Sequence, residues 1–251
     1  MKFQFKEKNG PGCLMMLKEE SSFEQNYYRQ KGGLNFYTIT WNIGGKQKVN
    51  IDEIDYDIAP NAVLPIMMNQ AFRFEKPEDI IAWQFNSEFY CIANHDAEVG
   101  CVGFLFYGPS PTMFVGLGHE ELSKMERIKS LFEEEFISDE DIKAEMLRML
   151  LVQLIIKLTR LAKKQYFHLD GDNEKFNLMR QYNLQVEIHY HKERQVQFYA
   201  GLLNKSPKTI SNIFSLYSKK TPLQVIHDRI IAEAKRLFYR ANASKLGYSD
   251  C

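Results

Sequence analysis

The chain has 251 residues, of which 45% are hydrophobic and 25% are charged, with 32 basic against 32 acidic side chains. This composition is typical of a globular protein and excludes a disordered or fibrous chain. The longest apolar stretch, residues 146–156, is interrupted by Arg148 and Gln153 and is too short to span a bilayer, so we expect no membrane partner. The first residues lack the apolar core of a secretory signal and the four cysteines are widely spaced, which together predict a cytoplasmic protein.

The balanced total conceals two parts of opposite charge. Residues 172–251 hold 13 Lys and Arg against 7 Asp and Glu, a net charge of +6, which leaves residues 1–171 with 19 against 25 and a net charge of −6. A basic C-terminal part on an acidic body indicates a module that binds a polyanion. A drift of surface charge along the chain is the alternative interpretation.

Residues 34–117 consist of short β-rich runs separated by turn signals such as Gly44-Gly45. The runs are LNFYTITWNI, KQKVNI, IDYDIAP, AVLPIMM, AFRFE, IIAWQF, GCVGFLFY and TMFVGL. Such runs at spacings of roughly ten residues are typical of an antiparallel sandwich or barrel. Aromatic side chains within them either line a pocket for a small-molecule effector or form the core of the barrel: Phe36, Trp41, Tyr56 and Trp83.

From residue 118 the pattern becomes helical. Residues 119–136 and 139–166 are rich in Leu, Met, Glu and Lys without Pro or Gly, and Ser138 with Asp141 forms a capping box for the second helix. Five leucines of the second helix follow the 4-3-4-3 spacing of a heptad seam: Leu147, Leu151, Leu154, Leu158 and Leu161. We predict that this seam joins two copies in a homodimer, and burial of the helix within one monomer is the alternative.

A second helical block follows a predicted linker at residues 168–173. Residues 196–203 predict a short helix, and Asn204 and Lys205 predict a turn. Ser206 is then the N-cap of another helix, with Pro207 at its first position. Its buried stripe has the spacing i, i+3, i+4 and i+7: Ile210, Ile213, Phe214 and Tyr217. The block therefore predicts a helix-turn-helix whose second helix fits the major groove of DNA.

The opposite face of this second helix is small and polar. We expect five of its side chains to reach base edges: Lys208, Thr209, Ser211, Asn212 and Ser215. Asn212 suits adenine, and Lys208 suits guanine or phosphate. Lysines at the two ends of the helix are predicted to neutralise phosphates: Lys205, Lys219 and Lys220. Thr221-Pro222 with Gln224 opens a further capped helix that runs to about residue 240.

Residues in a specific order and spacing across residues 176–251 carry a family resemblance: Tyr199, Ala200, Leu203, Ser206, Pro207, Ile210, Ser211, Phe214, Thr221, Pro222, Ile226, Arg229, Ile230, Ala234, Lys235 and Leu237. Together they resemble the DNA-binding domain of AraC/XylS-type transcription regulators. The resemblance implies two helix-turn-helix units joined by a long helix at residues 222–240, a cupin-like sensor barrel in the N-terminal half and a dimerising helix after it. The closing KLGYSDC resembles the approach to the second recognition helix, so we expect a truncated second unit.

We therefore predict an α+β multidomain chain. A cupin-like antiparallel β-barrel sensor occupies residues 1–117, a helical linker and dimerisation segment residues 118–167, and a helix-turn-helix DNA-binding domain with an incomplete second unit residues 168–251. The predicted function is that of a sequence-specific transcription regulator. Its partners would be double-stranded DNA, a second copy of the chain, an unknown small-molecule effector and, for an activator, RNA polymerase. Two alternatives are a barrel used for dimerisation only, and a ligand-binding or enzymatic barrel joined to a helical protein-interaction domain.

The sequence offers no catalytic constellation. A metal-binding cupin needs histidine and glutamate ligands on facing strands, but the first histidine, His95, follows most of the predicted strands. Neither a GxxxxGK phosphate loop nor a GxSxG nucleophile elbow occurs. We therefore expect no enzyme activity, no metal and no cofactor.

Overall fold

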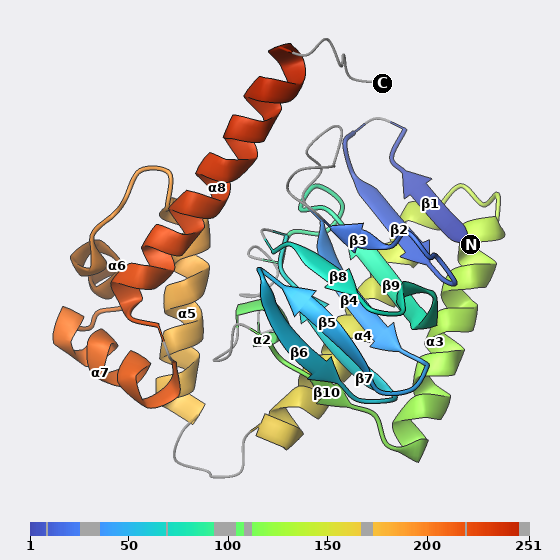
Figure 1. The fold of residues 1–251 in the computed structure, drawn as a ribbon, viewed down its shortest axis with the longest axis horizontal. Helices are drawn as coiled ribbons and strands as arrows, with labels where there is room; N and C mark the ends of the chain where they lie inside the picture. Colours follow the sequence, from blue (N-terminus) through green and yellow to red (C-terminus); the bar gives the residue numbers. More distant parts are fainter. Residues whose placement is uncertain are drawn as a thin grey trace.

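The computed structural model consists of a sheet-containing part followed by a helical part (Figure 1). It describes residues 1–8, 10–25, 36–68, 70–92, 104–107, 112–166, 173–218 and 220–245. Four sequence features lie outside these ranges: His95, most of the predicted linker, Lys219 and the chain from residue 246. No helix within the described ranges is both long and apolar enough to cross a membrane.

The strands are β1 (Lys2–Lys6), β2 (Cys13–Leu17), β3 (Glu24–Gln25), β4 (Tyr37–Asn42), β5 (Gln47–Ile51), β6 (Ile54–Ile58), β7 (Ala62–Ile66), β8 (Phe72–Phe74), β9 (Ile80–Phe85) and β10 (Val115–Gly116). The helices are η1 (Pro77–Asp79, a 3-10 turn), α2 (Phe104–Tyr107), α3 (His119–Ile137), α4 (Lys143–Tyr166), α5 (Asn173–His189), α6 (Val196–Leu202), α7 (Pro207–Tyr217) and α8 (Pro222–Lys245). Each predicted β-rich run except GCVGFLFY contains a strand. Residues 104–107 of that run form the buried helix α2 instead.

The strands form two antiparallel sheets and not the closed barrel that the sequence predicted. The strand order is β1-β2-β9-β4-β7-β10 in the larger sheet and β3-β8-β5-β6 in the smaller one. Each sheet ends in edge strands among the described residues, so neither closes on itself. The predicted α+β class and antiparallel pairing are confirmed, whereas barrel closure is corrected to a two-sheet arrangement.

The central strands of the larger sheet are buried on both faces, and every residue of β4 and β9 is buried. One face packs on the smaller sheet through an apolar core: Leu17, Phe23, Val49, Ile51, Ile58, Ala62, Leu64, Ile66, Phe72, Phe74, Ile80 and Ala82. The other face carries Trp41 and Trp83 toward α3 and α4; in Figure 1, α4 passes behind the strands and α3 stands at their right side. The rings of Trp83 and Phe132 of α3 lie 5.8 Å apart. Burial on both faces explains why β9 is almost entirely apolar, and why the alternating polar residues of β4 are hydrogen-bonded inside the protein, as Thr40 is to the Leu64 carbonyl and Thr38 to Gln84.

The leucine seam of α4 faces the core of its own chain. Leu147, Leu151 and Leu154 are 0% exposed, Leu158 is 1% exposed, and Leu161 packs against the same core. The predicted assignment of a dimer interface to these leucines is therefore corrected, and the seam anchors α4 within one monomer. The physical reason is the apolar outer face of the larger sheet, which needs a helix to cover it.

Two local predictions also change in the N-terminal half. Ser138 does not cap α4 but ends α3, where its backbone N–H donates to the Glu134 carbonyl, and α4 begins later, at Lys143. Strands β1 and β2 were not predicted. The alternation of polar and apolar residues in β1 and the run of five apolar residues in β2 were the available signals. In the structure, β2 lies beside β9, with Met16 opposite Trp83.

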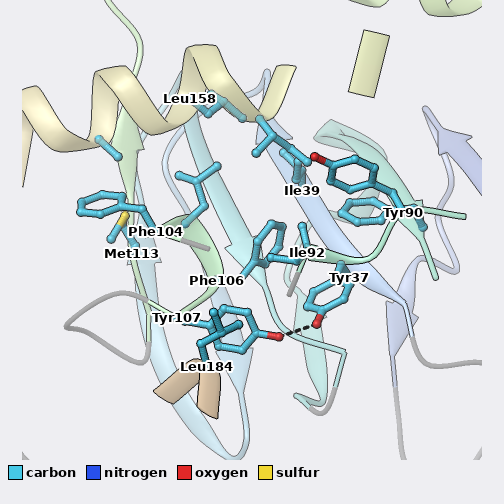
Figure 2. Packing of buried hydrophobic residues seen from close by; sticks show 14 of the residues in the cluster. Tyr37, Ile39, Tyr90, Ile92, Phe104, Phe106, Tyr107, Met113, Leu158 and Leu184 are labelled. Atoms are coloured by element: carbon cyan, nitrogen blue, oxygen red, sulfur yellow. Dashed lines mark hydrogen bonds between the residues drawn. The ribbon is translucent and has the colours of Figure 1, made fainter. Parts of the chain in front are cut away.

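Helix α5 connects the helical part to the sheet-containing part. Phe176 of α5 packs on Phe104 of α2 with ring centroids 5.2 Å apart, and Asn183 Nδ2 donates to the Tyr107 backbone oxygen at 3.2 Å. Figure 2 shows Leu184 beside the ring of Tyr107, whose hydroxyl is bonded to that of Tyr37. Burial raises the pKa of both hydroxyls well above the ordinary value for tyrosine. The two parts thus share one continuous apolar core.

Candidate nucleic-acid interface

The turn between α6 and α7 is closed by backbone hydrogen bonds. Asn204 takes a left-handed conformation with φ 52°, which asparagine tolerates better than most residues. Its N–H donates to the Gly201 carbonyl at 3.0 Å, and the Lys205 N–H donates to the Ala200 carbonyl at 2.9 Å. These two bonds form a Schellman motif, which ends α6 and sets the direction of the chain into α7. The turn predicted at Asn204 and Lys205 is present.

Helix α7 begins as the sequence predicts. Ser206 is its N-cap, and the Ser206 Oγ accepts a hydrogen bond from the Thr209 backbone N–H at 3.1 Å. Pro207 occupies the first helical position, where it has no N–H to leave unpaired. Thr221 and Gln224 exchange two bonds of 2.7 and 3.2 Å at the start of α8, which is the predicted capping box. Local capping therefore fixes where both helices start.

The apolar stripe of α7 is buried against α5. Ile210, Ile213 and Phe214 are 1%, 6% and 1% exposed, and the Phe214 ring meets the Tyr182 ring of α5 edge-on at 5.1 Å. Tyr182 also packs on Tyr199 of α6 at 5.5 Å and donates its hydroxyl to the Pro222 carbonyl at 3.1 Å. Tyr182 thus contacts α6, α7 and α8 at once.

Sequence reasoning did not single out Tyr182, although an aromatic residue within a helical apolar period was an available signal. Burial, reinforced by Tyr199, raises the pKa of the Tyr182 hydroxyl above the ordinary tyrosine value. Burial likewise raises the pKa of Tyr199 to about 12. Both tyrosines are therefore neutral across the physiological pH range and serve as packing and hydrogen-bonding groups.

The front of α7, opposite this stripe, is exposed and carries the predicted base-reading residues. Lys208, Ser211 and Asn212 are exposed, and their side chains make no hydrogen bond within the described residues. The other two are engaged locally. The Thr209 hydroxyl lies 2.9 Å from the Ser206 hydroxyl, and the Ser215 Oγ donates to the Asn212 carbonyl at 2.7 Å. The structure therefore brings all five onto one helix and leaves three of them available for a partner.

The predicted phosphate-binding lysines differ in their surroundings. Lys205 is exposed in the turn before α7. Lys220 forms an ion pair with Asp228 Oδ2 at 2.6 Å, and both side chains are about half exposed. Because an exposed pair of this kind contributes only about 0–1 kcal/mol, Lys220 can exchange its carboxylate partner for a phosphate at small cost.

A buried ion cluster locks α8 onto α5. Arg229 Nε and Nη2 donate to the two Glu187 carboxylate oxygens at 2.7 and 2.9 Å, and Nη1 donates to Glu233 at 3.3 Å. The guanidinium also lies 3.7 Å from the ring centroid of Tyr190. Burial alone would lower the pKa of Arg229, but the bonds to Glu187 outweigh it and raise the pKa above the ordinary value. The sequence indicated Arg229 only through the family resemblance.

The four aromatic residues predicted for an effector pocket belong to three different apolar clusters. Phe36 belongs to a small cluster with Cys13 and Met15, whereas Trp41 and Trp83 belong to the core under α3 and α4. Tyr56 packs at the edge of the core between the sheets. Tertiary packing thus places these four aromatic residues in different clusters. In the described part of the chain, no three metal-ligating side chains are grouped as they would be around an ion.

The chain was compared with known proteins by sequence and by structure. No family model and no curated protein matches its sequence. Among solved structures, the AraC-like transcriptional activator CuxR is similar at 12% identity and a TM-score of 0.37, over 89% of this chain and 73% of that chain. ToxT from Vibrio cholerae is similar at 10% identity and a TM-score of 0.33, over 91% of this chain and 98% of that chain.

A second ToxT structure, the wild-type protein from strain SCE256 bound to an unsaturated fatty acid, has 10% identity and a TM-score of 0.33. The match covers 90% of this chain and 94% of that chain. Of these neighbours, CuxR is described as AraC-like, the type that the sequence motifs resemble.

Proposed function

We propose that the chain is a sequence-specific DNA-binding transcription regulator, with a sheet-containing domain at residues 1–117, a helical linker at 118–167 and a DNA-reading domain at 168–251. The observation that carries the proposal is α7, a capped helix whose back is packed on Tyr182 and whose front leaves Lys208, Ser211 and Asn212 exposed. A helix of this width fits the major groove, where amide and ammonium groups can bond to base edges.

Charge and rigidity support the same function. The part of the chain that carries α7 has a net charge of +6, which favours a polyanion over a neutral partner. The Schellman turn and the Arg229 cluster hold α6, α7 and α8 in fixed positions, so the exposed side chains of α7 require little ordering on binding.

A selection experiment tests this proposal. The full chain is used to enrich duplexes from a random DNA library, and the enriched duplex is then titrated with Asn212→Ala, Lys208→Ala and a matched control, Lys175→Ala, on the exposed surface of α5. We expect Asn212→Ala to lose sequence preference, Lys208→Ala to weaken binding, and Lys175→Ala to bind as the parent does. Binding should also weaken steeply with salt. Absence of any enriched sequence would refute the proposal, and a largely apolar, salt-insensitive protein contact would favour the helical protein-interaction alternative.

We include a homodimer in the proposal, but through the outer face of α4. Met146 and Met149 on this face are 40% and 68% exposed, Ile142 just before the helix is 65% exposed, and the partly buried Ile156 continues the same row. The N-terminal end of this face is acidic, with exposed Glu140 and Asp141, and its C-terminal end is basic, with exposed Arg160 and Lys164. An antiparallel pair of α4 helices related by a twofold axis would bury the apolar row and place opposite charges side by side.

The oligomeric state of two variants tests this interface. Met149→Asp places a charge at the centre of the apolar row, whereas Ser130→Asp places the same charge on an exposed position of α3 away from it. Light scattering after size exclusion should give a monomer for the first variant and a dimer for the second. If the parent chain is a monomer at all concentrations, or if both variants dimerise equally, the interface is refuted.

An effector and an RNA polymerase contact complete the proposal. A metabolite that binds the sheet-containing domain should raise its melting temperature by mass action, so a thermal-shift screen identifies it. If no compound shifts the transition while the dimer forms, the domain binds none of the compounds screened and serves as the support on which the dimerising helix α4 packs. An activator should additionally raise transcription from a promoter that carries the selected site, in a purified system with RNA polymerase.

A further inference from the structure

One apolar side chain interrupts the polar front of α7. Leu216 is 64% exposed, whereas the apolar residues of the opposite stripe are almost completely buried. Lys208, Asn212 and Leu216 are spaced four residues apart, so they form a single row along the exposed face. The sequence prediction treated this face as polar only and did not include Leu216.

Leu216 also lies where the neighbouring polar group is already occupied. The Ser215 hydroxyl donates to the Asn212 backbone oxygen at 2.7 Å, so its proton is not available to a base at this end of the helix. Among the described side chains of the last turn of α7, the exposed group is therefore the isobutyl side chain of Leu216. Because burial of an isobutyl group is favourable against an apolar surface, Leu216 favours a partner that presents an apolar group.

We propose that Leu216 is a specificity residue that contacts the 5-methyl group of a thymine. This inference rests on the proposed DNA-binding function and adds the identity of one base to it. The thymine methyl is the only apolar group that the four standard bases present in the major groove. Four residues of helix rise about 6 Å, and base pairs are stacked about 3.4 Å apart. The thymine contacted by Leu216 therefore lies about two base steps from the base read by Asn212.

Replacement of thymine by deoxyuridine tests the contact, because it removes the methyl group and leaves the base pairing intact. Each thymine in the duplex selected by the parent chain is replaced in turn, and the dissociation constants are measured. We expect one position at which the parent loses about 3- to 10-fold in affinity, the range for one buried methyl group. Leu216→Ala should bind the thymine and uracil duplexes equally at that position. Leu216→Met and the control Lys175→Ala on α5 should retain the discrimination.

The outcomes separate this inference from the function on which it rests. If the parent binds the selected site but discriminates against uracil nowhere, Leu216 reads no methyl group, and the DNA-binding function stands. The same conclusion follows if Leu216→Ala, folded by circular dichroism, keeps the preference of the parent, as it would if Leu216 contacts another protein. If no duplex is bound at all, the proposed function itself fails.

Discussion

The Arg229 cluster gives a stability prediction whose size follows from its geometry. Arg229→Met removes three charge-assisted bonds of 2.7 to 3.3 Å and leaves Glu187 and Glu233 at 15% and 9% side-chain exposure without their counter-ion. Removing one partner of a buried ion pair costs about 3–5 kcal/mol, because the remaining charge stays buried. Since a domain is stable by only about 5–15 kcal/mol, we expect the variant to lose a large share of its stability.

Urea denaturation with two probes measures this loss. Both tryptophans, Trp41 and Trp83, lie in the sheet-containing part, so fluorescence reports that part, while circular dichroism at 222 nm also reports the helices. With a denaturant dependence of about 1–3 kcal/mol per molar urea, the dichroism midpoint should fall by at least about 1 M. The matched control is Lys220→Met, which breaks the exposed pair with Asp228 and should shift the midpoint little.

A second substitution distinguishes a buried charge from a lost packing contact. Arg229→Met combined with Glu187→Met replaces the strongest pair by apolar groups, which is often neutral or stabilising, so the double variant should recover part of the loss. Equal midpoints for Arg229→Met and Lys220→Met would refute the reasoning. Strict additivity of the two single variants would refute it as well, because independent sites do not share a charge.

Three further predictions concern single elements. Ser206→Ala removes the cap of α7 and should cost about 1 kcal/mol, while Ser211→Ala on the exposed face should be neutral; equal urea midpoints would contradict this. Burial raises the pKa of Tyr190 and Tyr199 from 10.0 to about 12. Their stabilising effect is complete below pH 10 and is lost as the pH rises to 12. The phenolate absorbance of these two tyrosines, obtained as the difference between the parent and Tyr190→Phe or Tyr199→Phe, should therefore appear together with unfolding, and not before it. Asn42→Ala removes the amide that donates to the Gly45 and Ala59 backbone oxygens, so the free energy of unfolding, measured by thermal melting, should fall by about 2–4 kcal/mol. An unchanged melting temperature would mean that water replaces the amide.

Helices α6 and α7 and the turn between them were predictable because their signals are local. Ser206, Pro207 and the i, i+3, i+4 stripe lie within a few residues of the bonds they make, and the cap and the burial agree with the sequence interpretation. The predicted strands β4 to β9 succeeded for the same reason, since turn residues and apolar runs fix the length of a strand. Features that depend on contacts with residues distant in the sequence were harder to predict.

The predictions that failed concern features that depend on the packing of elements distant in the sequence. Helix α4 has apolar residues both on its leucine seam and on its outer face, which carries Met146 and Met149. The sequence alone does not tell which of the two the sheet covers. The leucine seam is covered because β4 and β9 present Ile39, Trp41 and Trp83 on their outer side. Similarly, the β-rich run predicted at residues 100–107 contains helix α2 at residues 104–107, whose four buried residues pack between the larger sheet, α4 and α5. Periodicity over so short a run does not separate a buried helix from a buried strand.

Helix α5 determines how the candidate reading helix is placed relative to the rest of the chain. Tyr182 contacts α7 through Phe214, and the next residue, Asn183, donates to Tyr107 of α2. Because adjacent residues of a helix point in directions about 100° apart, one turn of α5 holds both neighbours. A rigid helix that is packed on both sides transmits a shift on one side to the other. We therefore expect a displacement of α5 on α2 to move α7 with it.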